Sequence, residues 1–443
     1  MEQPDRSDGF LRVMRDGTIR MTNPVSGLGS WFIPARASRP ITNAPGRPQQ
    51  AVDRREVEMR CEFCEANNLR TPPEKERLVA AGDGFRLVEG VGAPALGESR
   101  AAFRRVANLF EVVPYDYWVA NHGYRISERD GARMRAYLSD SAGKAHVDAL
   151  LAAKLAREGR PEEDLARLPV EERALLTEGL FGGSHDLVIT GRHFAEGSAA
   201  GAAPLGAGDL SQAEHAAYVG FAIRAIEDLH VQNPNVRYVM TFQNWLHAGG
   251  ASFDHLHKQL VGFDGWGVIL EREARLARSR PGIYNEAIID QASGHGLVLA
   301  ENDHAVLLVD IGHRHPTLGI YSRSATMRPW EQSEEEVRGM SDLIHAAHRA
   351  RGSEVPSNED WFYAPRDCDA PIPWRVLVRW RINNPSGFEG GTDLYIHPVS
   401  PFAMRDWVRD RLRRLAAGEG LRGFRLLEDG RCARSPLRAG QAS

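Results

Sequence analysis

Three side chains that could do chemistry alternate along one short stretch, GGASFDHLHKQLVG at residues 249–262. In an extended strand, side chains two residues apart share a face, so His255, His257 and Gln259 would lie about 7 Å apart from neighbour to neighbour. A neutral imidazole attacks phosphorus without first losing a proton, which makes His257 the better candidate for a nucleophile. The Gln259 amide can donate to a phosphate oxygen but, unlike a histidine, it does not readily carry protons. The pattern therefore favours transfer of a phosphorus group over its hydrolysis, with a polar strand end and a metal site as alternative interpretations.

Small residues precede this pattern. Gly249, Gly250 and Ala251 let a phosphate approach the backbone closely, and Ser252 can donate its hydroxyl. A small-residue turn is weak evidence alone. Combined with His-x-His-x-Gln directly after a strand, it is a specific indication of a phosphate site.

A second candidate site is Cys61-Glu-Phe-Cys64. Such a pair is typical of a zinc site or of redox exchange. A redox pair usually begins a helix, and the following residues 65–74, EANNLRTPPE, make a long helix implausible, so a metal is favoured over redox exchange and over two incidental buried cysteines. Without a second cysteine pair, the remaining ligands should come from the histidines His122, His185, His193, His247 and His255.

The composition limits the class of protein. The chain has 443 residues, 42% of them hydrophobic and 26% charged, with a net charge of -4, so neither nucleic acid nor an anionic membrane is favoured as a partner. The N-terminal residues lack an apolar run that could act as a signal peptide, and nowhere do 18 apolar residues run together. Cys368 and Cys432 stand alone, so a disulfide framework is not expected. These features predict a cytoplasmic globular protein.

The order of the predicted elements favours an α+β architecture with mainly antiparallel strands. A hairpin and an arginine-bearing loop occupy residues 1–60, and helical periodicity marks an inserted segment at about 111–183. An amphipathic helix at 210–231 leads to a strand at 236–245, directly before the histidine stretch. The strand, helix, strand order then recurs in the C-terminal half, which suggests an internal duplication.

Taken together, the motifs resemble those of the galactose-1-phosphate uridylyltransferase branch of the histidine-triad superfamily. Besides the histidine stretch, four segments carry the resemblance in the family's order: the N-terminal Asn23-Pro24-Val-Ser-Gly27 with Arg36-Ala-Ser-Arg39-Pro40, then Cys61-x-x-Cys64, Asn108-Leu-Phe110 and Phe242-Gln-Asn244. The resemblance implies two histidine-triad-like halves that share one sheet. We expect an N-terminal half at 1–270, including the inserted helices, a C-terminal half at 271–420, and a tail at 421–443.

The resemblance also implies roles for individual residues. His257 would attack the α-phosphorus of a nucleotide sugar and form a nucleotidyl-histidine, while Gln259 stabilises its phosphoryl oxygens. The other implied contacts are Ser252 and Asn244 to phosphate, Arg36, Arg39 and Asn108 to the nucleotide, and Asp393 to the sugar.

One structural zinc is implied at Cys61, Cys64, His193 and His255. His193 is preferred because it follows a strand and precedes the helix that leads to the strand at 236–245; His122 and His185 are the alternatives. At the place of a second metal site of the family, this chain has Leu377 and Arg379, so a second metal is not expected.

The leading functional hypothesis is therefore a nucleotidyltransferase that acts on a nucleotide sugar and a sugar 1-phosphate, as in galactose metabolism. A phosphorylase or hydrolase of a nucleotide sugar or dinucleotide is the second hypothesis, and a non-catalytic, zinc-stabilised nucleotide-binding protein is the third. The resemblance implies small-molecule partners and a homodimer.

Overall fold

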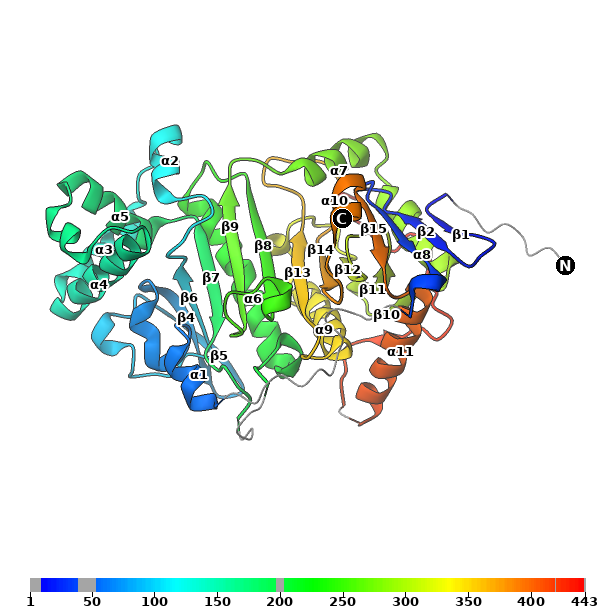
Figure 1. The fold of residues 1–443 in the computed structure, drawn as a ribbon, viewed down its shortest axis with the longest axis horizontal. Coiled ribbons are helices and arrows are strands. Elements are labelled where there is room, and N and C mark those ends of the chain that lie inside the picture. The colour runs from blue at the N-terminus through cyan, green and yellow to red at the C-terminus, as the bar shows by residue number, and fades with distance from the viewer. Residues whose placement is uncertain (1–8, 39–52, 197–202, 419, 442–443) are drawn as a thin grey trace.

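The computed structural model describes residues 9–38, 53–196, 203–418 and 420–441 of the chain (Figure 1). Its strands are β1 Leu11–Val13, β2 Ile19–Thr22, β3 Gly29–Phe32, β4 Glu74–Ala81, β5 Gly84–Glu89, β6 Phe103–Ala107, β7 His185–Thr190, β8 Tyr238–Trp245, β9 His257–Phe263, β10 Val298–Glu301, β11 Ala305–Asp310, β12 Thr317–Ser322, β13 Ser357–Phe362, β14 Arg375–Trp380, β15 Leu394–His397 and β16 Arg425–Leu426. Its α-helices are α1 Arg54–Arg60, α2 Tyr115–His122, α3 Glu128–Ser139, α4 Ser141–Arg157, α5 Val170–Gly182, α6 Gln212–Gln232, α7 Val268–Ser279, α8 Asp290–Gly294, α9 Glu334–Arg351, α10 Gly387–Thr392 and α11 Pro401–Gly418. The α+β fold class is confirmed.

Twelve strands form one large sheet in the order β16-β10-β11-β12-β14-β13-β8-β9-β7-β6-β4-β5, and each neighbouring pair is antiparallel. Its two halves have the same topology around the β8–β13 junction. In the first half, β7, α6, β8 and β9 follow one another and β9 pairs with both β7 and β8; in the second half, β12, α9, β13 and β14 repeat this arrangement. The same supersecondary unit therefore occurs twice in one continuous sheet.

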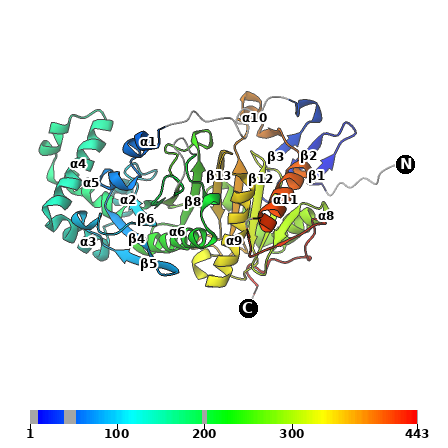
Figure 2. The same cartoon turned by 90° about the horizontal axis from the view of Figure 1, so that it is seen from below.

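Helices α6 and α9 cover one face of this sheet, and α1 and α10 lie on the opposite side (Figure 2). Both long helices begin with a capping box, Ser211 with Glu214 and Ser333 with Glu336, which satisfies backbone N–H groups that have no partner inside a helix. Their buried sides pack against the sheet core. Side chains on the other face of the central strands are therefore free of this helical cover.

An ion pair on the covered face joins the two halves. Lys258 of β9 points toward the helices and contacts Glu359 of β13, which also accepts a 2.6 Å hydrogen bond from His348 of α9. All three side chains are buried. Removing one partner of such a pair would leave an uncompensated charge in the core, which is strongly destabilising.

The predicted helical insertion is present between β6 and β7. It consists of α2, α3, α4 and α5 and has an apolar core of its own, formed by Tyr137, Val147, Leu150, Leu151 and Phe181 among others. In Figure 1 it projects from one end of the molecule. Its helices connect strands of the large sheet without adding a strand to it.

The N-terminal segment lies against the C-terminal half. Strands β1, β2 and β3 form a second sheet with β15, in which β3 and β15 are parallel. The Asn23 side chain accepts from the backbone N–H groups of Val25 and Ser26 and donates to the carbonyl of Ile311. The boundary expected at residue 270 stays a prediction, but residues 9–38 contact the half that follows it.

No helix in the described part of the chain is both long enough and apolar enough to cross a membrane.

Candidate active site

The chain brings Cys61, Cys64, His193 and His255 into one buried cluster, although they come from three separate segments. Sγ of Cys61 lies 3.6 Å from Nδ1 of His255, and Sγ of Cys64 lies 3.4 Å from Nδ1 of His193. All four potential ligand atoms are within 4.8 Å of one another. Tetrahedral zinc with ordinary Zn–S and Zn–N bonds places sulfur and nitrogen about 3.6 Å apart. The donor set and the spacing therefore fit zinc.

Hydrogen bonds to neighbouring groups orient the residues of this cluster. Nε2 of His255 donates to the carbonyl of Thr190 at 2.7 Å, which leaves the lone pair on Nδ1 directed at the cluster. The neighbouring Cys64 thiol, as a donor to the Cys61 sulfur, is the main cause that holds the pKa of Cys61 below its usual range, whereas the same contact raises the pKa of Cys64. A thiolate is the form of cysteine that binds a metal. The cluster therefore combines two sulfur and two nitrogen donors of the kind that bind zinc.

His257 begins β9 and lies beside the cluster. It is 4% exposed, and its Nδ1 donates to the backbone carbonyl of His255 at 2.7 Å. This hydrogen bond assigns the lone pair to Nε2, which no described residue hydrogen-bonds. Burial lowers the pKa of His257 to about 4, so the ring is neutral near neutral pH. The Phe63 ring, from the segment between the two cysteines, packs edge-on at 4.9 Å between centroids.

Gln259 lies on the same face as His257, one pleat further along β9. Its Oε1 is 3.3 Å from Nε2 of His185, a residue of the neighbouring strand β7. Nδ1 of His185 accepts from the backbone N–H of Val112 at 3.1 Å, so Nε2 carries the proton and donates to Gln259. The Gln259 amide nitrogen is therefore the end available to a ligand.

His185 was weighed as a zinc ligand, but the structure places it beside Gln259. Nδ2 of Asn108 lies 3.1 Å from Nε2 of His185; both atoms are donors in this tautomer, so Asn108 is a neighbour of the pair and not its hydrogen-bond partner. His122, the other alternative ligand, contacts Asp264 at 2.8 Å from α2. No pattern in the sequence indicates the His185–Gln259 contact, because it depends on the pairing of Leu187 with Gln259 between β7 and β9.

The loop between β8 and β9 combines strain and close packing. Leu246 has a positive φ of 61°, an unfavourable conformation for a residue with a side chain. A Cβ at Gly249 would lie 2.8 Å from the carbonyl oxygen of Ser357, so only glycine fits there. Asn244 at the end of β8 lies 3.4 Å from the carbonyl of Gly250, and Ser252 is exposed in this loop.

Two other candidate residues, Arg36 and Asp393, lie elsewhere. Arg36 is exposed at the end of a short helical turn after β3, in the small sheet that Figure 1 shows beside the C-terminal half and away from β9. Arg39 lies outside the described residues. Asp393 is exposed at the end of α10 with φ 51°, and its carboxylate accepts from the Tyr395 hydroxyl at 3.2 Å. The structure does not bring Arg36 or Asp393 to His257 within one chain.

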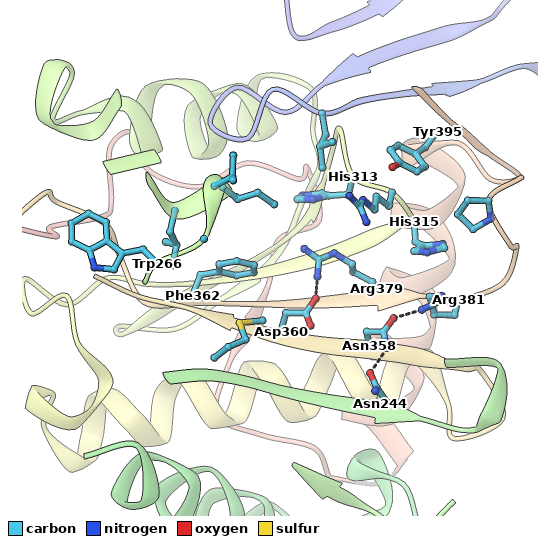
Figure 3. Close-up of a pocket in the computed structure, with 18 of the residues that line it drawn as sticks. Asn244, Trp266, His313, His315, Asn358, Asp360, Phe362, Arg379, Arg381 and Tyr395 are labelled. Carbon is cyan, nitrogen blue, oxygen red and sulfur yellow. Dashed lines mark hydrogen bonds and ion pairs between the residues drawn. The ribbon is translucent and has the colours of Figure 1, made fainter. Parts of the chain in front are cut away.

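A cavity of about 860 Å³ opens on the same face of the sheet (Figure 3). Asn244 lines one end of it, while His257 and Gln259 do not line it. The cavity extends over β13 and β14, where Asn358, Asp360, Arg379 and Arg381 point into it. It therefore begins next to the loop between β8 and β9 and continues over the C-terminal half.

This fold is that of the galactose-1-phosphate uridylyltransferase-like proteins, as the sequence resemblance implies. Over 89% of this chain and 98% of the other, the structure is similar to that of an ADP-glucose phosphorylase from Arabidopsis thaliana with bound ADP-glucose, with a TM-score of 0.55 and 16% identity. A galt-like protein from Arabidopsis thaliana gives a TM-score of 0.53 and 15% identity over 88% of this chain and 98% of its own. At 15–16% sequence identity, the similarity to these two structures shows the fold alone.

Residues 14–438 match the family model described as "Domain of unknown function (DUF4921)", and the chain belongs to this family. No curated protein matches the sequence.

Proposed function

We propose that this chain is a nucleotidyltransferase that moves a nucleotide from a nucleotide sugar to a sugar 1-phosphate through a nucleotidyl-His257 intermediate. The observation that carries the proposal is the 2.7 Å hydrogen bond from Nδ1 of His257 to the carbonyl of His255. It leaves the lone pair on Nε2, on the sheet face without helical cover. A neutral imidazole held in this tautomer is the form that attacks phosphorus.

The reaction has two balanced steps. In the first, the Nε2 lone pair of His257 forms a bond to the α-phosphorus, and the bond to the bridging oxygen breaks, so that sugar 1-phosphate leaves with the electron pair. In the second, a phosphate oxygen of the acceptor attacks the same phosphorus and the P–N bond breaks. The proton stays on Nδ1 throughout, hydrogen-bonded to the His255 carbonyl, which stabilises the positive charge that the ring gains in the intermediate.

Gln259, Ser252 and Asn244 are proposed to stabilise the phosphoryl oxygens. The Gln259 amide nitrogen would donate to an oxygen on phosphorus, because His185 occupies the carbonyl end of the amide. A glutamine at this position does not readily deliver a proton to a leaving group or activate water, so the intermediate would persist until an acceptor phosphate arrives. Transfer is therefore favoured over hydrolysis.

Zinc is proposed to bind Cys61, Cys64, His193 and His255. When bound, it supplies a fixed tetrahedral crosslink between the cysteine segment and the start of β9. The ligand His255 uses its carbonyl to hold His257, and the cysteine segment carries Phe63 against the His257 ring. These residues thereby position the nucleophile without taking part in the phosphorus chemistry.

Asn108 is proposed to contact the nucleotide, since it lies beside His185 and Gln259. Arg36, Arg39 and Asp393 are proposed to contact the substrates from a second chain of a homodimer, because Arg36 and Asp393 lie away from His257 in their own chain. The cytoplasmic location and a role in galactose or related carbohydrate metabolism are proposed with the same activity.

Incubation of the zinc-loaded protein with UDP- or ADP-glucose labelled at the α-phosphorus tests the proposal. The expected result is an acid-labile label on His257, released when a sugar 1-phosphate is added. The matched control His257→Gly should bind zinc, fold as the wild type does and take up no label, with turnover reduced by roughly a thousandfold or more. Absence of label with every nucleotide sugar tried would contradict the proposal.

A phosphorylase is the second candidate, in which inorganic phosphate replaces the sugar 1-phosphate. The fold likeness to an ADP-glucose phosphorylase supports it. Adding orthophosphate or a sugar 1-phosphate to the labelled intermediate separates the two: a nucleoside diphosphate is the product with the first acceptor and a nucleotide sugar with the second. Release of the labelled nucleotide from His257 in buffer without either acceptor would instead indicate a hydrolase.

A further inference from the structure

We propose that the cavity over the C-terminal half binds a second anionic group, a phosphate or a carboxylate, on the part of the substrate that lies beyond the reacting phosphorus. This inference rests on the proposed function, because it takes the position of phosphorus from His257. It narrows the substrate class from a sugar 1-phosphate to a sugar 1-phosphate that carries a further negative charge.

A straight row of residues leads from the nucleophile into the cavity. Phe242 pairs with Gln259, so continuing this register by one pleat places Asn244 opposite His257. Asn244 pairs with Asn358 on β13, and Asn358 pairs with Arg379 on β14. Adjacent strands are about 4.8 Å apart, so the backbone of Arg379 is roughly 14 Å from that of His257 along this row.

The substrate would lie along this row, with the sugar between the reacting phosphorus and the arginines of the cavity. The reacting phosphate would lie at the end of the cavity lined by Asn244, and the second group would lie over β14.

A hydrogen-bond chain follows the same direction. The Asn358 amide nitrogen donates to Oδ1 of Asn244 at 2.6 Å, and Arg381 donates to Oδ1 of Asn358 at 2.8 Å. Figure 3 shows these three side chains in line along the cavity floor. The Asn358 side chain therefore connects the residue proposed to contact phosphate with a guanidinium group of the cavity.

The charge of the cavity is positive. Arg314, Arg379 and Arg381 line it, and Asp360 is the only acidic residue among the described residues that do so. Asp360 forms an ion pair with Arg379 and neutralises one of the three guanidinium charges. The lining thus carries three guanidinium groups and one carboxylate, and arginine is the residue best suited to bind phosphate or carboxylate through paired N–H groups.

The neighbouring ionisable groups respond to this excess of positive charge. Burial, together with the charges of Arg381 and Arg379, lowers the pKa of His315 to about 3, so its ring adds no charge. Burial also lowers the pKa of Arg379 to about 10, and the nearby Arg314 acts in the same direction. The Asp310 carboxylate opposes the effect of burial on Arg379, and a bound anion would act in the same direction as Asp310.

The walls of the cavity suit a carbohydrate between the two anionic ends. Trp266 and Phe362 lie on one side and Tyr395 on another. Aromatic rings pack against the apolar faces of sugars, and the hydroxyls then face the polar floor. Arg314 stacks on the Tyr395 ring at 5.7 Å, which brings its charge toward this end of the cavity.

Calorimetric titration of the zinc-loaded full chain with glucose 1-phosphate, glucose 1,6-bisphosphate and glucuronate 1-phosphate tests the inference. We expect at least one of the doubly anionic compounds to bind about tenfold or more tightly than glucose 1-phosphate, since hydrogen bonds to charged groups are strong. An advantage for the bisphosphate alone identifies a phosphate site, and an advantage for both compounds identifies a site that accepts either anion. Equal affinity for all three compounds overturns the inference.

The double variant Arg314→Gln/Arg381→Gln should reduce this advantage to about twofold, whereas Arg381→Lys alone, which keeps the charge, should retain most of it. Arg413→Gln on α11, where Arg413 pairs with Glu428 far from the cavity, is the matched control. If the double variant still bound the doubly anionic compound as much more tightly than glucose 1-phosphate as the wild type does, the inference would be overturned. Because the titration needs no turnover, it gives an answer even if His257 takes up no label, so that failure of the proposed function and failure of this inference are distinguishable.

Discussion

At the scale of single residues, His255 uses its side chain and its backbone for different purposes. The ring belongs to the metal cluster through Nδ1, and the backbone carbonyl accepts the Nδ1 proton of His257. The alternation of His255, His257 and Gln259 follows from strand geometry and could be read from the sequence. The partner of Gln259 could not, because His185 is 74 residues away and reaches it only through the register of β7 and β9.

His185→Phe tests whether His185 positions the Gln259 amide. Loss of the Nε2 proton donor leaves the amide free to rotate, so its nitrogen no longer faces phosphorus in every molecule. We expect kcat for transfer to fall about tenfold with little change in KM, because a contact that matters mainly in the transition state is lost. The label on His257 should still form, only more slowly.

His122→Asn is the matched control for this variant, since His122 is an exposed histidine of α2 that pairs with Asp264. The His122→Asn variant should leave kcat and KM for transfer unchanged. A His185→Phe enzyme with wild-type kcat would show that the Gln259 orientation does not depend on His185.

At the scale of elements, the cysteine segment and the start of β9 form one unit. Cys61 closes α1, Cys64 begins the following helical turn, and Phe63 between them packs on His257. The pair of cysteines was recognisable from spacing alone. The choice of His193 needed the resemblance, because nothing in the local sequence distinguishes it from the other histidines; its ring now lies 3.4 Å from Cys64.

Cys61→Ser tests this unit. The hydroxyl is a poor ligand for zinc, so we expect substoichiometric zinc by metal analysis and a lower melting temperature. Nucleotidyl-His257 formation should fall in parallel with zinc content, since β9 loses its anchor. Cys432→Ser, at a cysteine of the C-terminal tail remote from the cluster, is the control and should keep full zinc. Full zinc occupancy in Cys61→Ser would refute the metal assignment.

At the scale of the whole molecule, many histidines are buried in a neutral state. Burial is the main cause that lowers the pKa values of His230, His345 and His397 to about 4 each. An unfolded histidine has a pKa of about 6.5. Between pH 6.5 and 4 the unfolded chain therefore binds more protons than the folded chain, and stability must fall as the pH is lowered through this window.

Urea unfolding at several pH values between 7.5 and 4.5 measures this effect. Each of these histidines contributes a slope of up to about 1.4 kcal/mol per pH unit. His345→Asn should reduce the slope, because one proton-binding difference is removed, whereas His122→Asn on the surface should not. A free energy of unfolding that stays constant between pH 7.5 and 4.5 would contradict the neutral state of these side chains.

The duplicated sheet was foreseen from the repeated order of elements, but the position of the N-terminal segment was not. The Asn23–Gly27 turn and Arg36 come first in the chain and were expected in the N-terminal half. The parallel pairing of β3 with β15 instead places them at the other end of the molecule. Long-range strand pairing of this kind leaves no periodicity in the sequence that could reveal its partner.

The place of Arg36 leads to a prediction about assembly. Because Arg36 is exposed and lies away from His257 in its own chain, a role in nucleotide binding requires a second chain whose Arg36 reaches this site. Arg36→Glu and His257→Gly should each be inactive alone. When the two are unfolded and refolded together, random pairing makes half of the dimers mixed, and each mixed dimer has one site with an intact His257 and an intact Arg36. Activity should therefore return to about a quarter of the wild-type value in a twofold-symmetric dimer. Inactivity of the refolded mixture, although mixed dimers form, would show that Arg36 does not serve the site of a second chain.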